Sequence, residues 1–124
     1  MSNVIRCRLS APDCKLAAVL SGYMTGETLD FQRVIPNLPA LATGDPAHFV
    51  WERMNKELWG CKSNVANGRV EPDGSLYFET SWYPPTLVIR RLSQHFPKLT
   101  FKLDCSAESG VWIGTYSFQN GKTC

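Results

Sequence analysis

The amino-acid sequence predicts an α+β fold in which helices pack on one face of a mostly antiparallel sheet. Two observations carry this prediction. Several short segments alternate apolar and polar residues, which is the period of a half-buried strand. Between them lie stretches whose apolar residues recur every three or four positions, which is the period of a helix with one buried face. The order of elements, about β-α-β-α-β-β-α-β-β, has no internal repeat or linker and predicts one domain over residues 1–124.

The first element is a predicted strand at Asn3–Leu9. Its apolar side chains point to one face, and Arg6 and Arg8 point to the other. Residues 14–24 place leucines at helical spacing and predict a short helix that ends at Gly22, because Gly is favoured just past a helix end.

Short extended segments are expected at Leu29–Phe31 and Val34–Pro36, followed by an irregular loop over residues 36–46. Asp45-Pro46 predicts the start of a second helix, since Asp caps helices and Pro suits the first helical position. Gly60 is expected to end this helix. Its predicted apolar stripe is Ala47, Val50, Trp51, Met54 and Leu58.

Residues 61–70 predict one strand with an irregular lead-in, within which Asn67-Gly68 is compatible with a turn. Residues 71–74 predict a tight turn, because Pro fixes φ at the second position and Gly suits the fourth. The strand that follows has the apolar face Leu76, Phe78, Thr80 and Trp82. Pro84-Pro85 stops this strand and suits the start of a helix. The predicted stripe of that helix is Val88, Ile89, Leu92 and Phe96.

The carboxyl-terminal part resumes the alternation of strands. One predicted strand presents Leu99, Phe101, Leu103 and Cys105. After a turn at residues 107–110, the last predicted strand presents Trp112, Gly114, Tyr116 and Phe118. Residues 121–124 are expected to be a loose tail. The whole order describes an α+β sandwich of ferredoxin-like topology, a name for the arrangement only, because iron–sulfur sites need thiolates at fixed spacing.

Composition limits the class of protein. The net charge of +2 is too small to indicate nucleic-acid binding on its own, and the apolar content of 44% is ordinary for a folded domain. No segment is long and apolar enough for a membrane span, and the amino terminus lacks the apolar core of a signal peptide. We therefore expect a cytoplasmic protein without a membrane partner.

Cysteine and histidine positions do not indicate a metal centre or a catalytic site. The five cysteines form no CxxC pair, and His48 and His95 lack a zinc-like spacing from them, so reduced thiols without metal or other cofactor are expected. Cys61 and His48 are the only thiol–imidazole pair worth considering. They lie about thirteen residues apart, near 20 Å along a helix axis. No phosphate loop, dinucleotide fingerprint or nucleophile elbow is present, and we expect no enzyme activity.

Aromatic and basic residues leave two interpretations open. Trp59, Trp82 and Trp112 are compatible with a stacking platform for single-stranded nucleic acid, but core packing is favoured for most of them. Trp112 and Tyr116 are the expected exceptions. The arginines at positions 6, 8, 90 and 91 are compatible with phosphate contacts, although interleaved acidic residues favour a mixed, solvated surface.

A family resemblance rests on a set of short motifs. In chain order they are Leu29-Asp30-Phe31, Val34-Ile35-Pro36, Leu58-Trp59-Gly60-Cys61-Lys62, Leu76 to Trp82, Pro84-Pro85, Leu92-Ser93, Phe96-Pro97 and Gly114. Their order resembles the YubB-type ferredoxin-like domain family of plasmid and phage proteins, over roughly residues 29–114. Ser63 departs from the family pattern, which usually has a Trp there. The resemblance implies the fold and a mobile-element origin, and it implies no reaction.

The expected function is therefore binding. The strand alternation leaves one sheet face away from the helices, and we expect Arg6, Arg8 and Tyr77 to carry most of the contacts, with Arg90 and Arg91 as second choice. The leading hypothesis is a non-enzymatic inhibitor of a bacterial defence complex, anti-CRISPR-like, which blocks a host protein or ribonucleoprotein complex sterically. The alternative is a nucleic-acid-binding accessory protein for plasmid or phage maintenance. A third reading is a small hydrolase or transferase with an unrecognised site.

Overall fold

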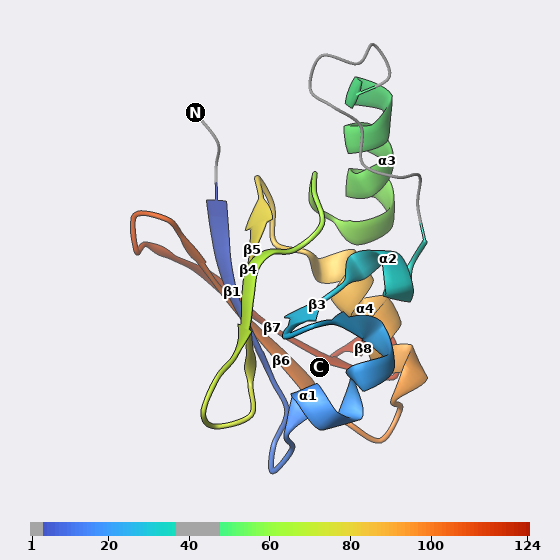
Figure 1. The fold of residues 1–124 in the computed structure, drawn as a ribbon, viewed down its shortest axis with the longest axis vertical. Helices are drawn as coiled ribbons and strands as arrows, with labels where there is room; N and C mark the ends of the chain where they lie inside the picture. The colour runs from blue at the N-terminus through green and yellow to red at the C-terminus, as the bar shows by residue number, and fades with distance from the viewer. Residues whose placement is uncertain (1–3, 37–47) are drawn as a thin grey trace.

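The computed structural model describes residues 4–36 and 48–124. Within them the main sheet has six strands in the order β4-β5-β1-β6-β7-β8, each antiparallel to its neighbours. In that order they are Ala66–Val70, Leu76–Ser81, Val4–Ser10, Phe101–Ala107, Trp112–Gln119 and Lys122–Thr123. Figure 1 shows the described helices on one side of this sheet. The predicted α+β architecture is confirmed.

The smaller elements lie on the helix side. The hairpin of β2 (Met24–Thr25) and β3 (Thr28–Leu29) contacts β4 and β5. The helices are α1 (Leu16–Val19), the 3-10 helix η1 (Ser21–Tyr23), α2 (Phe31–Val34), α3 (His48–Trp59) and α4 (Thr86–His95). Among the described helices, none has the length and apolar character needed to cross a bilayer.

Strand β1 is the centre of the fold, because it pairs with β5 on one side and with β6 on the other. Ile5, Cys7 and Leu9 are buried, whereas Arg6 and Arg8 are exposed, as the alternation predicts. Buried side chains of β5, β6, β7 and the helices complete one continuous core.

Helix α4 closes the core from the helix side, directly after Pro84-Pro85. Its buried side chains are Val88, Ile89, Leu92 and Ser93. Leu76 and Phe78 of β5 belong to the same core cluster, so the predicted association of this strand with this helix is confirmed for these two residues.

Trp82 does not join that core, and the predicted alternation is wrong at this point. Strand β5 ends at Ser81, and Trp82 is 41% exposed with a φ of +74°. The Tyr83 N–H donates to the Ser81 carbonyl at 2.9 Å and closes a γ-turn around Trp82. This turn redirects the chain, so the indole leaves the face that carries Leu76 and Phe78. A positive φ is strained for so bulky a residue.

Helix α2 occupies Phe31–Val34, so the extended segments expected at Leu29–Phe31 and Val34–Pro36 are confirmed only at their outer ends, where Leu29 lies in β3 and Ile35 is extended. The physical reason is its cap. The Asp30 carboxylate accepts a hydrogen bond from the Gln32 N–H at 3.0 Å and satisfies a donor at the start of the helix. The Asn64 side chain in turn donates to Asp30 at 2.8 Å, a long-range contact that local pattern does not reveal.

The predicted stripe of helix α3 is confirmed at Trp51, which is buried, and at Leu58, which packs half-buried against the core, but it is wrong at Val50. Val50 is 55% exposed, whereas Asn55 is fully buried between Trp51 and the end of the helix. Burial of Asn55 is possible because its side-chain amide donates to the Lys62 carbonyl at 2.9 Å. Gly60 ends the helix as predicted, with a φ of +90°. The predicted helix start and most of the loop before it fall within residues 37–47, outside the described part of the chain.

Two further predictions about strands are corrected. The register of β4 and β5 shifts between Ala66 and Arg69, so Asn67, with a φ of +49°, sits in a β-bulge rather than a turn. The residues expected to form a loose tail, 121–124, include β8, which pairs with the end of β7. An exposed edge strand has unpaired backbone N–H and C=O groups, and here β8 forms backbone hydrogen bonds with those of β7.

Replacement of Leu92 by Ala should lower the free energy of unfolding by about 2–5 kcal/mol, because it empties a fully buried site. Leu87→Ala on the same helix is the matched control and should cost clearly less, since Leu87 is 41% exposed. Urea unfolding followed by tryptophan fluorescence measures both. Equal losses would show that the buried face of α4 is assigned wrongly.

Replacement of Asp30 by Ala should destabilise the fold by about 1 kcal/mol at neutral pH, through loss of the α2 cap. Burial raises the pKa of Asp30, but hydrogen bonds from Asn64, Thr25 and Gln32 outweigh it and hold the pKa below the ordinary 3.8. The charged carboxylate therefore stabilises the fold fully above the pKa of the unfolded chain, and this stabilisation is lost as pH falls through the lower folded pKa.

The stability difference between the parent and Asp30→Ala should accordingly be constant above about pH 5 and shrink below about pH 4. Chemical unfolding across this pH range measures it. Glu27→Ala, at an exposed acidic residue in the neighbouring turn, is the control. A difference independent of pH would contradict the assigned role of the carboxylate.

Trp82→Gly should be more stable than Trp82→Ala by about 1 kcal/mol. Both variants lose the indole, but only Gly accepts the φ of +74° without strain. Elsewhere in a chain Ala is usually the more stable of the two, so the sign of the difference, measured by thermal or urea unfolding, tests the turn. The reverse order would contradict it.

Candidate binding site on the open face of the sheet

The face of the main sheet that the described helices leave uncovered is called the open face below. Two rows of side chains cross it in register through β4, β5, β1, β6 and β7 in turn. The first row is Ala66, Glu79, Arg6, Ser106 and Trp112. The second row is Arg69, Tyr77, Arg8, Asp104 and Thr115.

Trp112 reaches the open face because of a β-bulge. Regular alternation places it with Gly114 and Phe118, which face the core. The register of β6 and β7 shifts between Cys105 and Ser106, so that Trp112 lies opposite Ser106 instead. One extra residue on a strand moves the next side chain to the other face of the sheet. The indole is 67% exposed.

A hollow of about 230 Å³ lies on the open face. Its lining residues are Arg6, Cys7, Arg8, Tyr77, Asp104, Cys105, Ser106 and Trp112. The strand order places Tyr77 at one margin and Trp112 at the other, with the two arginines of β1 between them. Aromatic rings and arginines in this arrangement are the side chains most enriched at the centres of protein interfaces.

Arg8 is held in place by its neighbours. Its Nη2 donates to the Asp73 carboxylate at 2.6 Å, and its Nε donates to the Ser75 hydroxyl at 3.0 Å. Hydrogen bonds from Ser75, and then the Arg8 charge, hold the pKa of Asp73 below its ordinary value. Arg8 is therefore a fixed part of the surface, and a ligand has to displace Asp73 to bind it at two points.

Tyr77 belongs to a second local network. Its hydroxyl donates to Glu79 at 2.7 Å, the Asn67 amide donates to the other carboxylate oxygen at 2.8 Å, and the Arg69 guanidinium lies 4.0 Å above the ring centre. The hydrogen bonds from Asn67 and Tyr77 lower the pKa of Glu79. Burial, and then the bond to Glu79, raise the pKa of the Tyr77 hydroxyl.

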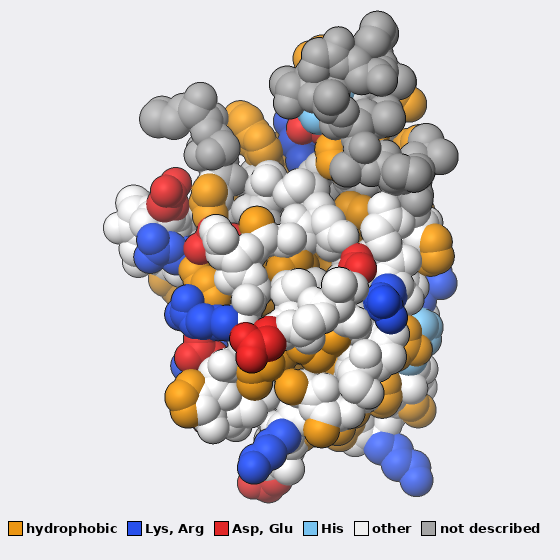
Figure 2. Space-filling model, in the orientation of Figure 1, with side chains coloured by type: hydrophobic (Ala, Val, Ile, Leu, Met, Phe, Trp, Pro, Cys, Tyr) orange, Lys and Arg blue, Asp and Glu red, His pale blue; other side chains and the backbone are white. Residues whose placement is uncertain are grey.

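Arg6 differs from three other cations of the open face. Those three each pair with a carboxylate, as Arg8–Asp73, Arg69–Glu71 and Lys102–Asp104. Arg6 is exposed and makes no hydrogen bond or ion pair with another residue of the described ranges. The view of Figure 2 takes in the side of the molecule that carries the helices, and there too basic and acidic side chains are interspersed. Of the two arginines that line the hollow, Arg6 is thus the one without an ion pair to a described residue.

Two carboxylates and one tyrosine at the site have shifted pKa values. The pKa values of Asp73 and Glu79 are lowered and that of Tyr77 is raised, whereas a general acid or base works best with a pKa near the working pH. The Cys61 thiol is buried, which raises its pKa to about 12, so it stays protonated. His48 lies beside Glu52 and Trp51 instead. Within residues 4–36 and 48–124, no three metal-ligating side chains cluster.

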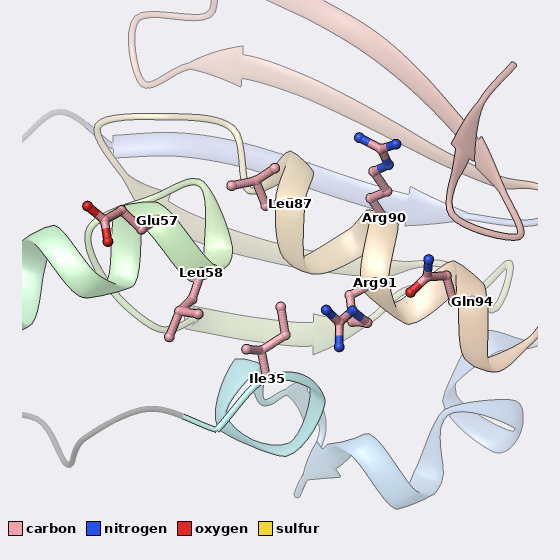
Figure 3. A pocket seen from close by; sticks show the side chains of 7 residues that line it. All are labelled: Ile35, Glu57, Leu58, Leu87, Arg90, Arg91 and Gln94. Atoms are coloured by element: carbon pink, nitrogen blue, oxygen red, sulfur yellow. The ribbon is translucent and has the colours of Figure 1, made fainter.

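The second predicted pair of arginines lies on the helix side. A pocket of about 310 Å³ between α2, α3 and α4 includes both, together with Ile35, Glu57, Leu58, Leu87 and Gln94. Figure 3 shows Arg91 turned toward Ile35, whereas Arg90 points away from the centre of the pocket. The Arg90 Nε donates to the Gly121 carbonyl at 2.5 Å, so Arg90 anchors the chain end. Arg91 alone is free to serve this pocket, far from the open face.

The structure therefore brings Arg6, Arg8 and Tyr77 together around one hollow and separates them from Arg90 and Arg91; their roles in binding stay predictions. Trp112 is exposed as expected, whereas Tyr116 packs half-buried against the core. Sequence reasoning did not place Trp112 beside Arg6. A signal was present in the run of three apolar residues 111–113 directly after a turn, which regular alternation cannot bury.

Comparison with known proteins adds one family. Residues 58–124, more than half of the chain, match the family described as the ferredoxin-like domain in Api92-like protein. That description names a fold and no reaction. No curated protein and no solved structure gives a significant match.

Proposed function

Since this chain belongs to the family of the ferredoxin-like domain in Api92-like protein, we propose that it is a non-enzymatic binding protein whose open face docks on a larger complex. The observation that carries this proposal is the hollow between Tyr77 and Trp112, lined also by Arg6, which makes no hydrogen bond or ion pair with a described residue. At one hollow, Trp112 can bury a large apolar side chain against a partner, and Arg6 can donate hydrogen bonds in a fixed direction.

The charges of the open face favour a protein partner. Most of its cations are neutralised by carboxylates, so the face presents alternating signs instead of a continuous positive track. Binding to a phosphate backbone depends on several unneutralised cations. A protein surface with both signs of charge and an apolar pocket for Trp112 is the better complement.

More specifically, we propose that the protein is an anti-CRISPR-like inhibitor of a bacterial defence complex, which acts by covering a functional surface of that complex. It rests on the resemblance to YubB-type domains of plasmid and phage proteins and on a surface suited to binding without chemistry. The place of action is then the cytoplasm of a bacterial host, and the partner is a host protein or ribonucleoprotein complex. Plaque counts of a targeted phage on a defence-competent host should rise when this protein is expressed and stay unchanged on a host without the system.

Arg6→Glu and, separately, Trp112→Ala should each weaken capture of the partner by about tenfold or more, because both side chains face the hollow. Tagged protein in a defence-competent lysate, with mass spectrometry of what co-purifies, measures capture relative to the parent. Lys98→Glu, the same reversal at an exposed lysine in the loop after α4, should have little effect.

Thermal unfolding of each variant comes first, so that lost folding is not taken for lost binding. Arg91→Glu tests the helix-side pocket in parallel. Full capture by the folded Arg6 and Trp112 variants would rule out the open face. Capture lost only with Arg91→Glu would move the interface to the pocket between the helices.

A further inference from the structure

A second group of aromatic and basic side chains lies where β5 leads into α4, and none of the open-face contacts involves it. It consists of Trp82, Tyr83, Lys56 and Lys62 and is called the Trp82 patch. The Lys62 ammonium lies 4.5 Å from the Trp82 ring centre, and the Lys56 ammonium lies 4.4 Å from the Tyr83 ring centre. Trp82 is 41% and Tyr83 37% exposed.

The backbone of this patch is held in a strained form by several bonds. The Ser81 carbonyl accepts from the Tyr83 N–H at 2.9 Å and from the Lys62 N–H at 3.2 Å. The Thr80 hydroxyl donates to the Tyr83 carbonyl at 3.1 Å. Strain of the kind seen at Trp82 persists only where the surroundings enforce it, and such positions concentrate at binding and catalytic sites. The γ-turn keeps a large aromatic side chain outside the core.

Lys62 is positioned from the other side as well. The buried Asn55 side chain donates to the Lys62 carbonyl at 2.9 Å, and Asn55 precedes Lys56 in α3. One buried amide thus ties together the backbone segments that carry the two lysines. A buried polar side chain has to be matched by hydrogen bonds, and here the match also fixes the spacing of the patch.

The charges of the patch differ from those of the open face. Neither Lys56 nor Lys62 has a carboxylate within ion-pair distance among the described residues, whereas Arg8, Arg69 and Lys102 all do. A lysine over an aromatic ring keeps its whole positive charge, because the ring offers a quadrupole and no anion. The patch therefore presents two uncompensated cations beside two aromatic rings.

We propose that the Trp82 patch binds single-stranded nucleic acid. The rings of Trp82 and Tyr83 stack on bases, and Lys56 and Lys62 contact the phosphates beside them. Every nucleobase has a π-face, so this mode is tolerant of sequence. The flexible stem of each lysine lets its ammonium move from the ring to a phosphate when a base takes its place. Duplex is a poor ligand for the patch because its bases are already stacked on one another.

An oligothymidylate of about 15 nucleotides, labelled with fluorescein, is the probe, and fluorescence anisotropy across a salt series is the measurement. The parent protein should bind it with an affinity that falls as salt rises, and should bind a duplex of the same length more weakly. Trp82→Gly, which accepts the positive φ, should weaken binding by about fivefold to a hundredfold. Lys56→Ala and Lys62→Ala should each lower the salt slope by about 0.7.

Matched controls are Trp112→Ala, the other exposed tryptophan, and Lys98→Ala, and both should bind within about twofold of the parent. Lys56→Ala removes an exposed side chain and leaves the turn intact, so it tests the patch even if the Trp82 variant fails to fold. Absence of saturable binding by the parent at low salt overturns the proposal. So does equal binding by the Trp82 and Trp112 variants.

The two proposals for this protein fail independently. Arg6→Glu should weaken partner capture by about tenfold or more and leave oligothymidylate binding intact, whereas the patch variants should weaken oligothymidylate binding and leave partner capture intact. If the patch variants instead lose partner capture and the parent never binds the oligonucleotide, Trp82 and its lysines belong to a protein interface, and the nucleic-acid proposal is wrong.

Discussion

The fold and its candidate site depend on one constraint, the double pairing of the central strand β1. Because β1 is bonded to β5 and β6 on its two sides, its register cannot slip without breaking both ladders. That register sends Ile5, Cys7 and Leu9 into the core and Arg6 and Arg8 to the open face. The burial of Ile5, Cys7 and Leu9 therefore fixes the side of the sheet on which the candidate binding residues of β1 lie.

Each exposed aromatic residue of interest lies where regular structure is interrupted. A β-bulge turns Trp112 out of the core-facing series and sets it in line with Arg6 across β6. A γ-turn at the end of β5 carries Trp82 away from Leu76 and Phe78. The bulge and the γ-turn each expose a large apolar side chain and each disturb the backbone only locally. The alternation of the rest of each strand is unchanged.

The open face and the Trp82 patch differ in the groups that lie next to their positively charged side chains. On the open face, carboxylates pair with Arg8, Arg69 and Lys102, which gives that face both signs of charge. In the Trp82 patch, Lys56 and Lys62 rest on aromatic rings and keep their charge. The first arrangement has the mixed charge of a surface that complements another protein, and the second has the uncompensated positive charge that an anionic chain requires.

The sequence by itself determined the strands with clean alternation, the turn at residues 71–74 and the buried stripe of α4, because their periods report directly which side is buried. It also placed Arg6, Arg8 and Tyr77 on one face. Only the tertiary structure decided the helix at Asp30, where Asn64 from a distant segment supports the cap, the exposure of Trp82, and the place of Trp112 in line with Arg6. A bulge, a γ-turn and a long-range hydrogen bond each depend on partners that no local period records, and a single extra residue is enough to move a side chain from the core to the surface.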